Sequence, residues 1–324
     1  MSFQAAPVSL EDLQSPLDGQ LQQVEGELRR IVESDFPLIM DVNSHLFQMR
    51  GKLFRPTMLL LANSATGRRN EHAATLAAVV ELIHLATLVH DDSVDHSVMR
   101  RGMPTINALF SHQISVIMGD YLYSRAVIEL VRLRDLGPLE VLSRVTNEMT
   151  VGEMRQLLSH DPLGFTEESY DLLIRSKTAS LLSGACEVGA LRAETAERAA
   201  LRRFGECLGM AFQIVDDLLD YTEEEAVTGK PSGADLREHK VTLPLIAALP
   251  RLDDRERADV NALMASPEPT DGQIEAVIGA VDRVGGLRYA RERAERLARM
   301  AEIELDALPP SPSTEALRAS ITYV

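Results

Sequence analysis

The chain has 324 residues, of which 45% are apolar, and a formal net charge of −16 at pH 7. Its length allows one large hydrophobic core or two smaller ones. The negative charge argues against nucleic acid or an anionic membrane as the main partner, although it describes the average surface and is compatible with a local basic pocket.

Two features predict a cytoplasmic protein without a transmembrane segment. The N-terminal stretch MSFQAAPVSLEDLQ lacks the basic and apolar regions of a secretory signal. The two cysteines, Cys186 and Cys207, have neither metal-ligand spacing nor a disulfide pattern, as expected in a reducing compartment.

The spacing of apolar residues predicts an all-α protein. Apolar residues recur at intervals of three and four, and period-2 runs of β-branched residues are missing, so we expect about ten to thirteen helices. Helix starts are predicted at Ser9, Thr166 and Thr195, where a capping side chain precedes acids. Helix ends are predicted at Gly51, Gly67, 102–104, 161–164, 229–233 and 309–313. Because no linker or change of composition divides the chain, we expect a single domain, 1–324.

The most apolar stretch, residues 73–90, contains Glu81 and His84 and ends in aspartates, which predicts a core helix rather than a membrane span. Positions four apart share one face of a helix, so Asp91 and Asp95 present two carboxylates side by side. Acids in this arrangement at the end of a buried helix indicate a binding site.

A second acidic cluster has the same DDxxD spacing. The segment QIVDDLLDY, 213–221, places Asp216, Asp217 and Asp220 after an apolar run. Two such motifs on neighbouring helices would form an oxygen-rich site for hard cations. Mg²⁺ fits best, because it shares its coordination with substrate phosphates.

Basic residues follow loop and helix-end signals. Each alone is typical of a surface, but together they can converge on an anion, and arginine offers a planar fork for phosphate oxygens. They are Lys52 and Arg55 in RGKLFRP, Arg100 and Arg101, Lys177 in RSKTAS, and Lys230, Arg237 and Lys240 in GKPSGADLREHK. Acids and bases together predict a polyphosphate substrate.

These motifs, in this order, resemble the trans-type polyprenyl diphosphate synthases. The resemblance covers residues 48–246 and includes ELIHLATLVHDDSVDHSVMRRGMPT, GDYLYSRA, GEMRQ, SKTASLL and FQIVDDLLDYTEEEAVTGKPSGADLREHKVTLPLI. It implies a helical bundle around a central cavity and a homodimer. It also implies Mg²⁺-dependent condensation of isopentenyl diphosphate with an allylic diphosphate.

The resemblance also implies a role for each candidate residue. The metal ligands would be Asp91, Asp95, Asp216 and, more weakly, Asp220. The isopentenyl diphosphate pocket would contain Lys52, Arg55, His84 and Arg101. The ligands of the allylic diphosphate would be Arg100, Lys177, Thr178, Gln213, Lys230 and Lys240. The residues expected to act in catalysis are Asp91, Asp95, Arg100, Lys177, Asp216 and Lys230, with Gln156, Thr178 and Gln213 as uncharged polar contacts.

Product length is expected to depend on Ala86 and Thr87, about one turn before Asp91. Relatives with short products often carry an aromatic residue there, whereas this chain has a small and a medium residue. We expect a hexaprenyl to decaprenyl product, with octaprenyl as the central value. A geranylgeranyl or farnesyl diphosphate synthase, with Met118 or Phe110 closing the tunnel, is the alternative.

Other classes account for fewer of the motifs. An HD-type phosphohydrolase would use His90 and Asp91 but would leave DDLLD and RGKLFRP without a role. A ferritin-like di-iron bundle needs a second pair like Glu81 and His84. A terpene cyclase would replace the second aspartate motif, and an inactive regulatory subunit would have lost one. The chain departs from the family at Arg50, where a glycine is usual, and at its end, ITYV, which lacks a basic tail.

Overall fold

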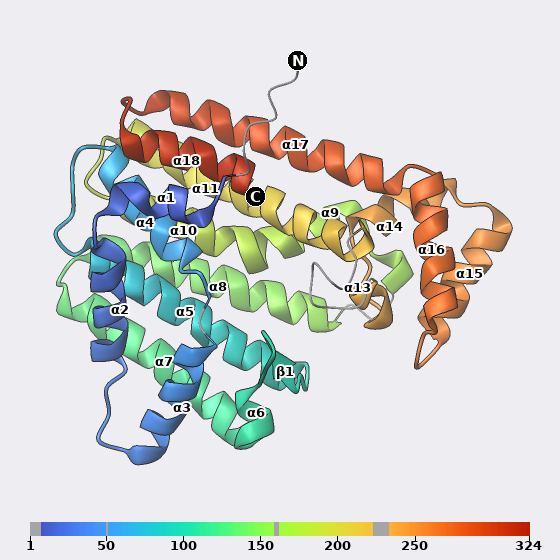
Figure 1. The fold of residues 1–324 in the computed structure, drawn as a ribbon, viewed down its shortest axis with the longest axis horizontal. Helices are drawn as coiled ribbons and strands as arrows, with labels where there is room; N and C mark the ends of the chain where they lie inside the picture. The colour runs from blue at the N-terminus through green and yellow to red at the C-terminus, as the bar shows by residue number, and fades with distance from the viewer. Residues whose placement is uncertain (1–7, 50, 159–161, 223–232) are drawn as a thin grey trace. The chain divides into compact units, whose positions relative to one another are not determined.

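The computed structural model describes residues 8–49, 51–158, 162–222 and 233–324. The described chain is helical apart from a short antiparallel hairpin of β1 (Met99–Arg100) and β2 (Met103–Pro104), which pairs Met99 with Pro104 (Figure 1). The predicted all-α class is confirmed. Among the described helices, thirteen have eight or more residues.

The chain divides into two compact units. The first comprises Met1–Thr146, Leu181–Gly205 and Glu304–Tyr323, and the second comprises Asn147–Ser180 and Glu206–Ile303. The expectation of a single domain over residues 1–324 stays a prediction, and each unit is described separately below.

The first unit is built around α5. Its helices are α1 (Leu10–Gln14), α2 (Gln20–Ile31), α3 (Pro37–Gln48), α4 (Phe54–Ala65), α5 (Ala73–Val94), α6 (Ile106–Leu109), α7 (His112–Arg132), the start of α8 (Leu136–Leu158), most of α10 (Ser180–Gly189), the start of α11 (Thr195–Thr222), and α18 (Pro312–Tyr323). Helix α5 packs against α7, α2 and α4, while α18 packs against α4 and α1. A helix apolar on all sides is stable only when other helices surround it, which explains the central place of α5.

Helix α5 alone among the described helices is long and apolar enough to cross a membrane, with a mean hydropathy of 1.7. In this structure 67% of its most apolar window is buried inside the protein. That burial is what the sequence predicted for a core helix.

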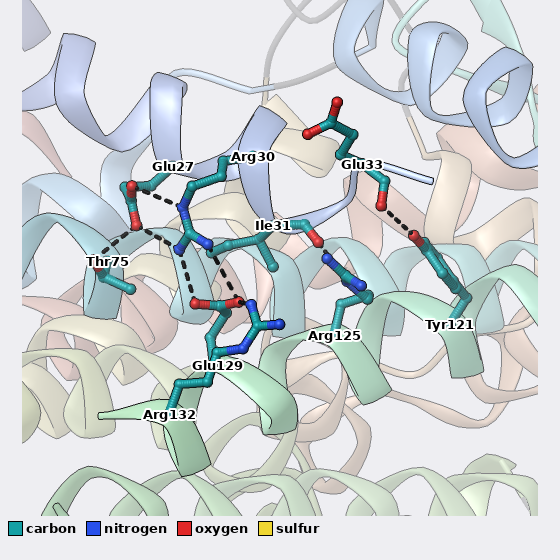
Figure 2. Close-up of polar contacts among 9 residues, drawn as sticks. All are labelled: Glu27, Arg30, Ile31, Glu33, Thr75, Tyr121, Arg125, Glu129 and Arg132. Carbon is teal, nitrogen blue, oxygen red and sulfur yellow. Dashed lines mark hydrogen bonds and ion pairs between the residues drawn. The ribbon is translucent and has the colours of Figure 1, made fainter. Parts of the chain in front are cut away.

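A polar network fixes α2 to α5 and α7 (Figure 2). The buried carboxylate of Glu129 accepts from Arg30 at 2.8 Å and from Arg132 at 2.5 Å. Arg30 also pairs with Glu27, which accepts a hydrogen bond from Thr75 of α5 at 2.8 Å. The two guanidinium partners compensate the desolvation of this buried carboxylate. Their contacts also determine which faces of the helices meet.

The second unit contains the end of α8, η2 (Pro162–Gly164), α9 (Glu167–Ile174), a π-helical turn η3 (Arg175–Ala179), the rest of α11, α13 (Ala234–Arg237), α14 (Leu243–Ala248), α15 (Asp254–Ala265), α16 (Asp271–Arg283) and most of α17 (Gly286–Glu304). One core cluster joins α9, α11, α14 and α17 through Tyr170, Ile214, Leu243 and Ala290. This packing places the second aspartate motif beside α9.

Several predicted boundaries are confirmed. Ser9 forms a capping box with Asp12, and Thr166 accepts from Ser169 N–H at 3.2 Å. Gly67, with φ of +68°, follows the end of α4.

The start predicted at Thr195 is confirmed, because α11 begins at that residue, and the N–H of the preceding Glu194 donates to the Glu197 side chain at 3.1 Å. Another predicted boundary is wrong. The helix end predicted at 102–104 lies in the hairpin instead, because α5 stops at Val94. The end predicted within 229–233 falls largely outside the described residues.

Candidate functional site

The first aspartate motif lies at the end of α5. Asp95 caps the helix, and its N–H donates to the Asp91 carbonyl at 2.8 Å, so the two residues are one turn apart on one face. Asp91 is half-buried and Asp95 is exposed. The backbone thus places the two residues at the spacing that the sequence predicted, and the approach of their carboxylates stays a prediction.

Asp92 has a different environment. Its buried carboxylate accepts from Arg100 Nε at 2.8 and 3.0 Å, which ties the hairpin to α5. Burial raises the pKa of Asp92, and the Arg100 charge offsets this only in part. Sequence reasoning assigned Arg100 to a diphosphate and missed this ion pair, because nothing in the local spacing distinguishes an arginine with a buried partner.

The hairpin turn brings Arg101 to the loop before α4. Arg101 and Gly102 both have positive φ, at +51° and +74°. Arg101 Nη1 donates to the Met49 carbonyl at 2.9 Å. A Cβ at Gly51 would lie 2.8 Å from the same Nη1, so the guanidinium approaches a position that glycine keeps open.

Arg55 and Arg101 lie close enough to His84 to affect its titration. Burial lowers the pKa of His84 well below 6.5, and the charges of Arg55, Arg101 and Arg100 lower it further, so its imidazole is neutral at pH 7. Burial also lowers the pKa of Arg55, opposed by the nearby Glu81 carboxylate. The first unit therefore contains a basic pocket, which we define as Arg55, His84 and Arg101. The Nε–H of Arg55 is a buried donor in this pocket without a hydrogen-bond partner.

Lys52, the fourth residue predicted for this pocket, is exposed at the start of the same loop. Its carbonyl accepts from Gln14 Nε2 at 3.2 Å, which anchors the loop to α1. Leu53, with φ of +54°, then turns the chain into α4.

In the second unit, the acids of the second motif differ from one another. Asp216 is exposed, whereas Asp217 is buried and accepts from Tyr170 Oη at 2.5 Å and Gln213 Nε2 at 2.9 Å. Burial raises the pKa of Asp217 to about 7, despite these two hydrogen bonds. Burial and the Asp217 charge also raise the pKa of Tyr170, so the phenol remains a donor.

The Asp220 carboxylate is already held by the backbone. Its two oxygens accept from the N–H groups of Ala234 and Asp235, each at 3.0 Å, at the start of α13. Burial raises the pKa of Asp235 to about 6, with Asp220 as the next cause. Asp235 is an acid of this cluster that sequence reasoning missed, because fifteen residues separate it from Asp220 and no helical period relates them.

Lys177 and Thr178 lie in the π-helical turn that follows α9. Lys177 Nζ pairs with Glu153 at 2.8 Å and approaches Gln156 Oε1 at 3.4 Å. Thr178 Oγ1 donates to Gln213 Oε1 at 2.8 Å. Since π-helical turns frequently mark functional sites, the turn supports the choice of these residues.

Gln213 links these residues to the second motif. Its Oε1 accepts from Thr178 and its Nε2 donates to Asp217, so both ends of the amide are fixed. The resulting chain of contacts runs from Tyr170 through Asp217 and Gln213 to Thr178. Of the remaining candidates, Lys240 pairs with Glu238 at 2.6 Å, and Lys230 lies outside the described residues.

The described residues contain no group of three or more His, Cys, Asp or Glu side chains arranged to hold a metal ion. The first motif nevertheless offers two carboxylates on one helical face. Such a pair fits a cation such as Mg²⁺ that completes its coordination with water and substrate oxygens.

The residues expected to set product length lie on α5. Ala86 is buried, and Thr87 is half-buried with its hydroxyl donating to the His84 carbonyl at 2.8 Å. Met118, the residue of the alternative reading, is buried on α7, which packs against α5.

The helical fold and the two aspartate motifs define the class of the protein, an all-α isoprenoid synthase. The family model for polyprenyl synthetase matches residues 36–281. The chain belongs to the polyprenyl synthetase family and is a prenyltransferase.

Individual relatives extend over nearly the whole chain. The all-trans-nonaprenyl-diphosphate synthase (geranyl-diphosphate specific) of Rhodobacter capsulatus is 39% identical over 309 residues, covering 95% of this chain and 94% of that protein. Octaprenyl diphosphate synthase of Escherichia coli (strain K12) is 37% identical over 314 residues, 96% of each chain. The crystal structure of polyprenyl synthase from Caulobacter crescentus CB15, complexed with calcium and isoprenyl diphosphate, has a TM-score of 0.91 at 34% identity over 98% of both chains. The family expected from the sequence is thereby confirmed.

Proposed function

We propose that the protein condenses isopentenyl diphosphate with an allylic diphosphate, in a Mg²⁺-dependent reaction, to make a trans-polyprenyl diphosphate of about eight prenyl units for quinone side chains. The relatives named for nonaprenyl and octaprenyl products support the long-chain assignment. The calcium and isoprenyl diphosphate in the Caulobacter crescentus structure support a divalent metal and a diphosphate substrate.

The observation that carries this proposal is the basic pocket beside the first aspartate motif. His84 and Asp91 both lie on α5, seven residues apart, so they share a face and are separated by about 10.5 Å along the axis. One face of α5 thus presents carboxylates for a metal-bound diphosphate and, two turns away, a metal-free pocket for a second. A condensation of two diphosphates needs both environments.

In the proposed reaction, bound Mg²⁺ would neutralise the allylic diphosphate as its C–O bond breaks. Asp91 and Asp95 would hold the metal that binds this diphosphate, and Asp216 of the second motif would be a further metal ligand. Arg55, His84 and Arg101 hold isopentenyl diphosphate, whose double bond attacks the allylic carbon and forms the new carbon–carbon bond. Loss of a proton to the departed diphosphate restores neutrality.

The uncharged residues have a separate part in the proposal. Thr178 and Gln213, fixed by the chain of hydrogen bonds to Tyr170, present polar atoms without a strong base. Lys177 and Lys240 add positive charge for the leaving diphosphate, as would Arg100 and Lys230. Fixed dipoles and charges stabilise a developing charge without solvent reorganisation.

We also propose a cytoplasmic homodimer. Helix α7 exposes the apolar side chains of Ile117, Ile128 and Val131. Ile128 lies eleven residues after Ile117 and three before Val131, and at 3.6 residues per turn these spacings place all three on one face. An exposed apolar stripe of this kind fits a symmetric contact with a second copy.

The test is an assay with isopentenyl diphosphate and geranyl diphosphate, with and without Mg²⁺, followed by chromatography of the dephosphorylated products. We expect a long-chain polyprenol only with Mg²⁺. A geranylgeranyl or farnesyl product would disprove the chain length while leaving the reaction class intact, and hydrolysis without elongation would disprove the reaction.

A further inference from the structure

A second concave site lies in the first unit, far from the first aspartate motif. This cavity of about 970 Å³ is lined by residues 68–72, residues 133–136 and Arg192. Helix α5 begins at Ala73, directly after the lining residues 68–72. Asp91 lies eighteen residues further along that helix, or about 27 Å away. The cavity is therefore separate from the first aspartate motif, and an inference about it goes beyond the proposed condensation.

The lining of this cavity has a net positive charge, in contrast to the chain as a whole. Four of its residues are arginines and two are acids, whereas the whole protein has a net charge of −16. The arginines are Arg68, Arg69, Arg134 and Arg192, and the acids are Glu71 and Asp135. Four guanidinium groups gathered in one cavity repel one another, and a bound anion relieves that repulsion.

Half of these arginines already have partners. Arg68 pairs with Glu194 at 2.5 Å, and Arg192 pairs with Asp135 at 3.0 Å. Within the part of the chain that the structure describes, Arg69 and Arg134 have no ion-pair partner, and both are exposed. Two charges thus remain available to a ligand.

The backbone that carries Arg68 and Arg69 is held in place. The N–H of the buried Asn70 donates to Asn63 Oδ1 at 2.8 Å, and Asn70 Oδ1 accepts from His72 N–H at 3.0 Å. These bonds pin the loop to α4. A site whose backbone is already ordered loses less entropy when it binds.

The second segment is ordered in a similar way. Arg134 has φ of +53°, and its N–H donates to the Val131 carbonyl at 3.1 Å. Asp135 then accepts from Gly137 N–H at 3.0 Å, where α8 starts. The cavity lies where α7 ends and where α5 and α8 begin, so the helix dipoles partly offset one another and the arginine charges carry the preference for an anion.

We propose that this cavity binds the phosphate group of a phosphate-bearing ligand. Arginine forks match phosphate oxygens in geometry and charge, and Arg69 and Arg134 supply the forks that no carboxylate occupies. Leu133 and Leu136 give the cavity an apolar edge, and Leu136 is 77% exposed. The phosphate can come from a soluble diphosphate or from a phospholipid headgroup, and the apolar edge favours an amphiphile.

The experiment compares the full-length protein with an Arg69→Gln/Arg134→Gln variant. The matched control is Arg291→Gln/Arg296→Gln, which removes the same charge from exposed positions of α17. In one arm, inorganic diphosphate is added without divalent metal, and hydrogen exchange is followed in peptides covering 68–73 and 133–137. In the other arm, the protein is sedimented with phosphatidylcholine vesicles that contain or lack phosphatidylglycerol.

We expect slower exchange in both peptides, binding to phosphatidylglycerol vesicles, or both, with the cavity variant requiring about tenfold more of the probe. The control variant should behave as the wild type, and condensation activity should be unchanged in both variants. Protection by diphosphate alone would identify a soluble ligand, and vesicle binding alone would identify a headgroup. The proposal is overturned if neither probe binds, or if the cavity variant binds as well as the wild type.

Discussion

Asp91 and Asp220 occupy motifs of the same spacing, but their carboxylates have different surroundings. Asp91 lies half-buried at the end of α5, whereas both oxygens of Asp220 accept backbone N–H groups at the start of α13. Asp91→Asn should reduce turnover by at least about a hundredfold without loss of helix, because a metal ligand is removed. Diphosphate release with Mg²⁺ and circular dichroism provide the measurements. A variant with more than about a tenth of the wild-type rate would contradict the metal assignment.

The matching change at Asp220 should act on stability. Asn retains one acceptor oxygen, so Asp220→Asn loses one of the two bonds to Ala234 and Asp235, at a cost of about 1 kcal/mol. We expect a lower melting temperature and a smaller loss of turnover than in Asp91→Asn. Equal kinetic losses in the two variants would make Asp220 a ligand of the same rank as Asp91.

Gly51 is the residue that lets Arg101 reach the basic pocket. Gly51→Ala would place a Cβ 2.8 Å from Arg101 Nη1, and the flexible end of Arg101 must then move. The fold should survive, and KM for isopentenyl diphosphate should rise about tenfold, because one guanidinium contact is lost. The control is Gly26→Ala on α2, where the new methyl group meets no atom within 4 Å. An unchanged KM in Gly51→Ala would remove Arg101 from the pocket.

His84 gives the protein a pH-dependent stability. Its pKa is lowered in the folded protein, so the unfolded chain binds the proton first as pH falls below 6.5. The stability that neutral His84 contributes is therefore present above pH 6.5 and is lost progressively below it. His84→Gln does not titrate and should flatten the fall in melting temperature between about pH 7 and pH 5. Identical pH profiles of wild type and variant would contradict the assignment of His84 as neutral in the folded protein.

At the scale of elements, α5 is the central helix of the first unit's core and also carries the first aspartate motif. The residues expected to form the wall of the product tunnel lie on the same helix. Ala86 is buried one turn before the aspartates on this helix. Ala86→Tyr should shorten the main product, because the added ring fills the space along the helix beneath Asp91. Chromatography of the dephosphorylated products is the measurement, and Ala86→Ser is the control of similar volume. If Ala86→Tyr leaves the product distribution unchanged, the chain does not extend past this position.

At the scale of the whole molecule, the exposed stripe on α7 is the feature on which the homodimer proposal depends. In a symmetric dimer each substitution appears twice, so Ile117→Asp would place two charges in one apolar interface. We expect a dimer for the wild type and a monomer for the variant in sedimentation at micromolar concentration. Ile303→Asp, the same change at an exposed apolar position of α17, shows whether any added charge has the same effect. A wild-type monomer would disprove the homodimer.

The sequence by itself determined the helical class, the two acidic motifs and the family. These features are local: a helix repeats every 3.6 residues, so the spacing of Asp91 and Asp95 already defines a shared face. The capping residues Ser9 and Thr166 were predictable for the same reason, since a cap acts within the next three residues.

Only the tertiary structure decided which partners these residues have. Tyr170 reaches Asp217 across 47 residues of sequence, and Arg101 reaches Met49 across 52. The π-helical turn at Lys177 likewise has no signature in the spacing of apolar residues. Contacts of this kind depend on how helix faces pack and how backbone turns are held, and neither is encoded in the neighbours of a residue along the chain. The backbone-bound Asp220 and the arginine-lined cavity therefore became visible only in three dimensions.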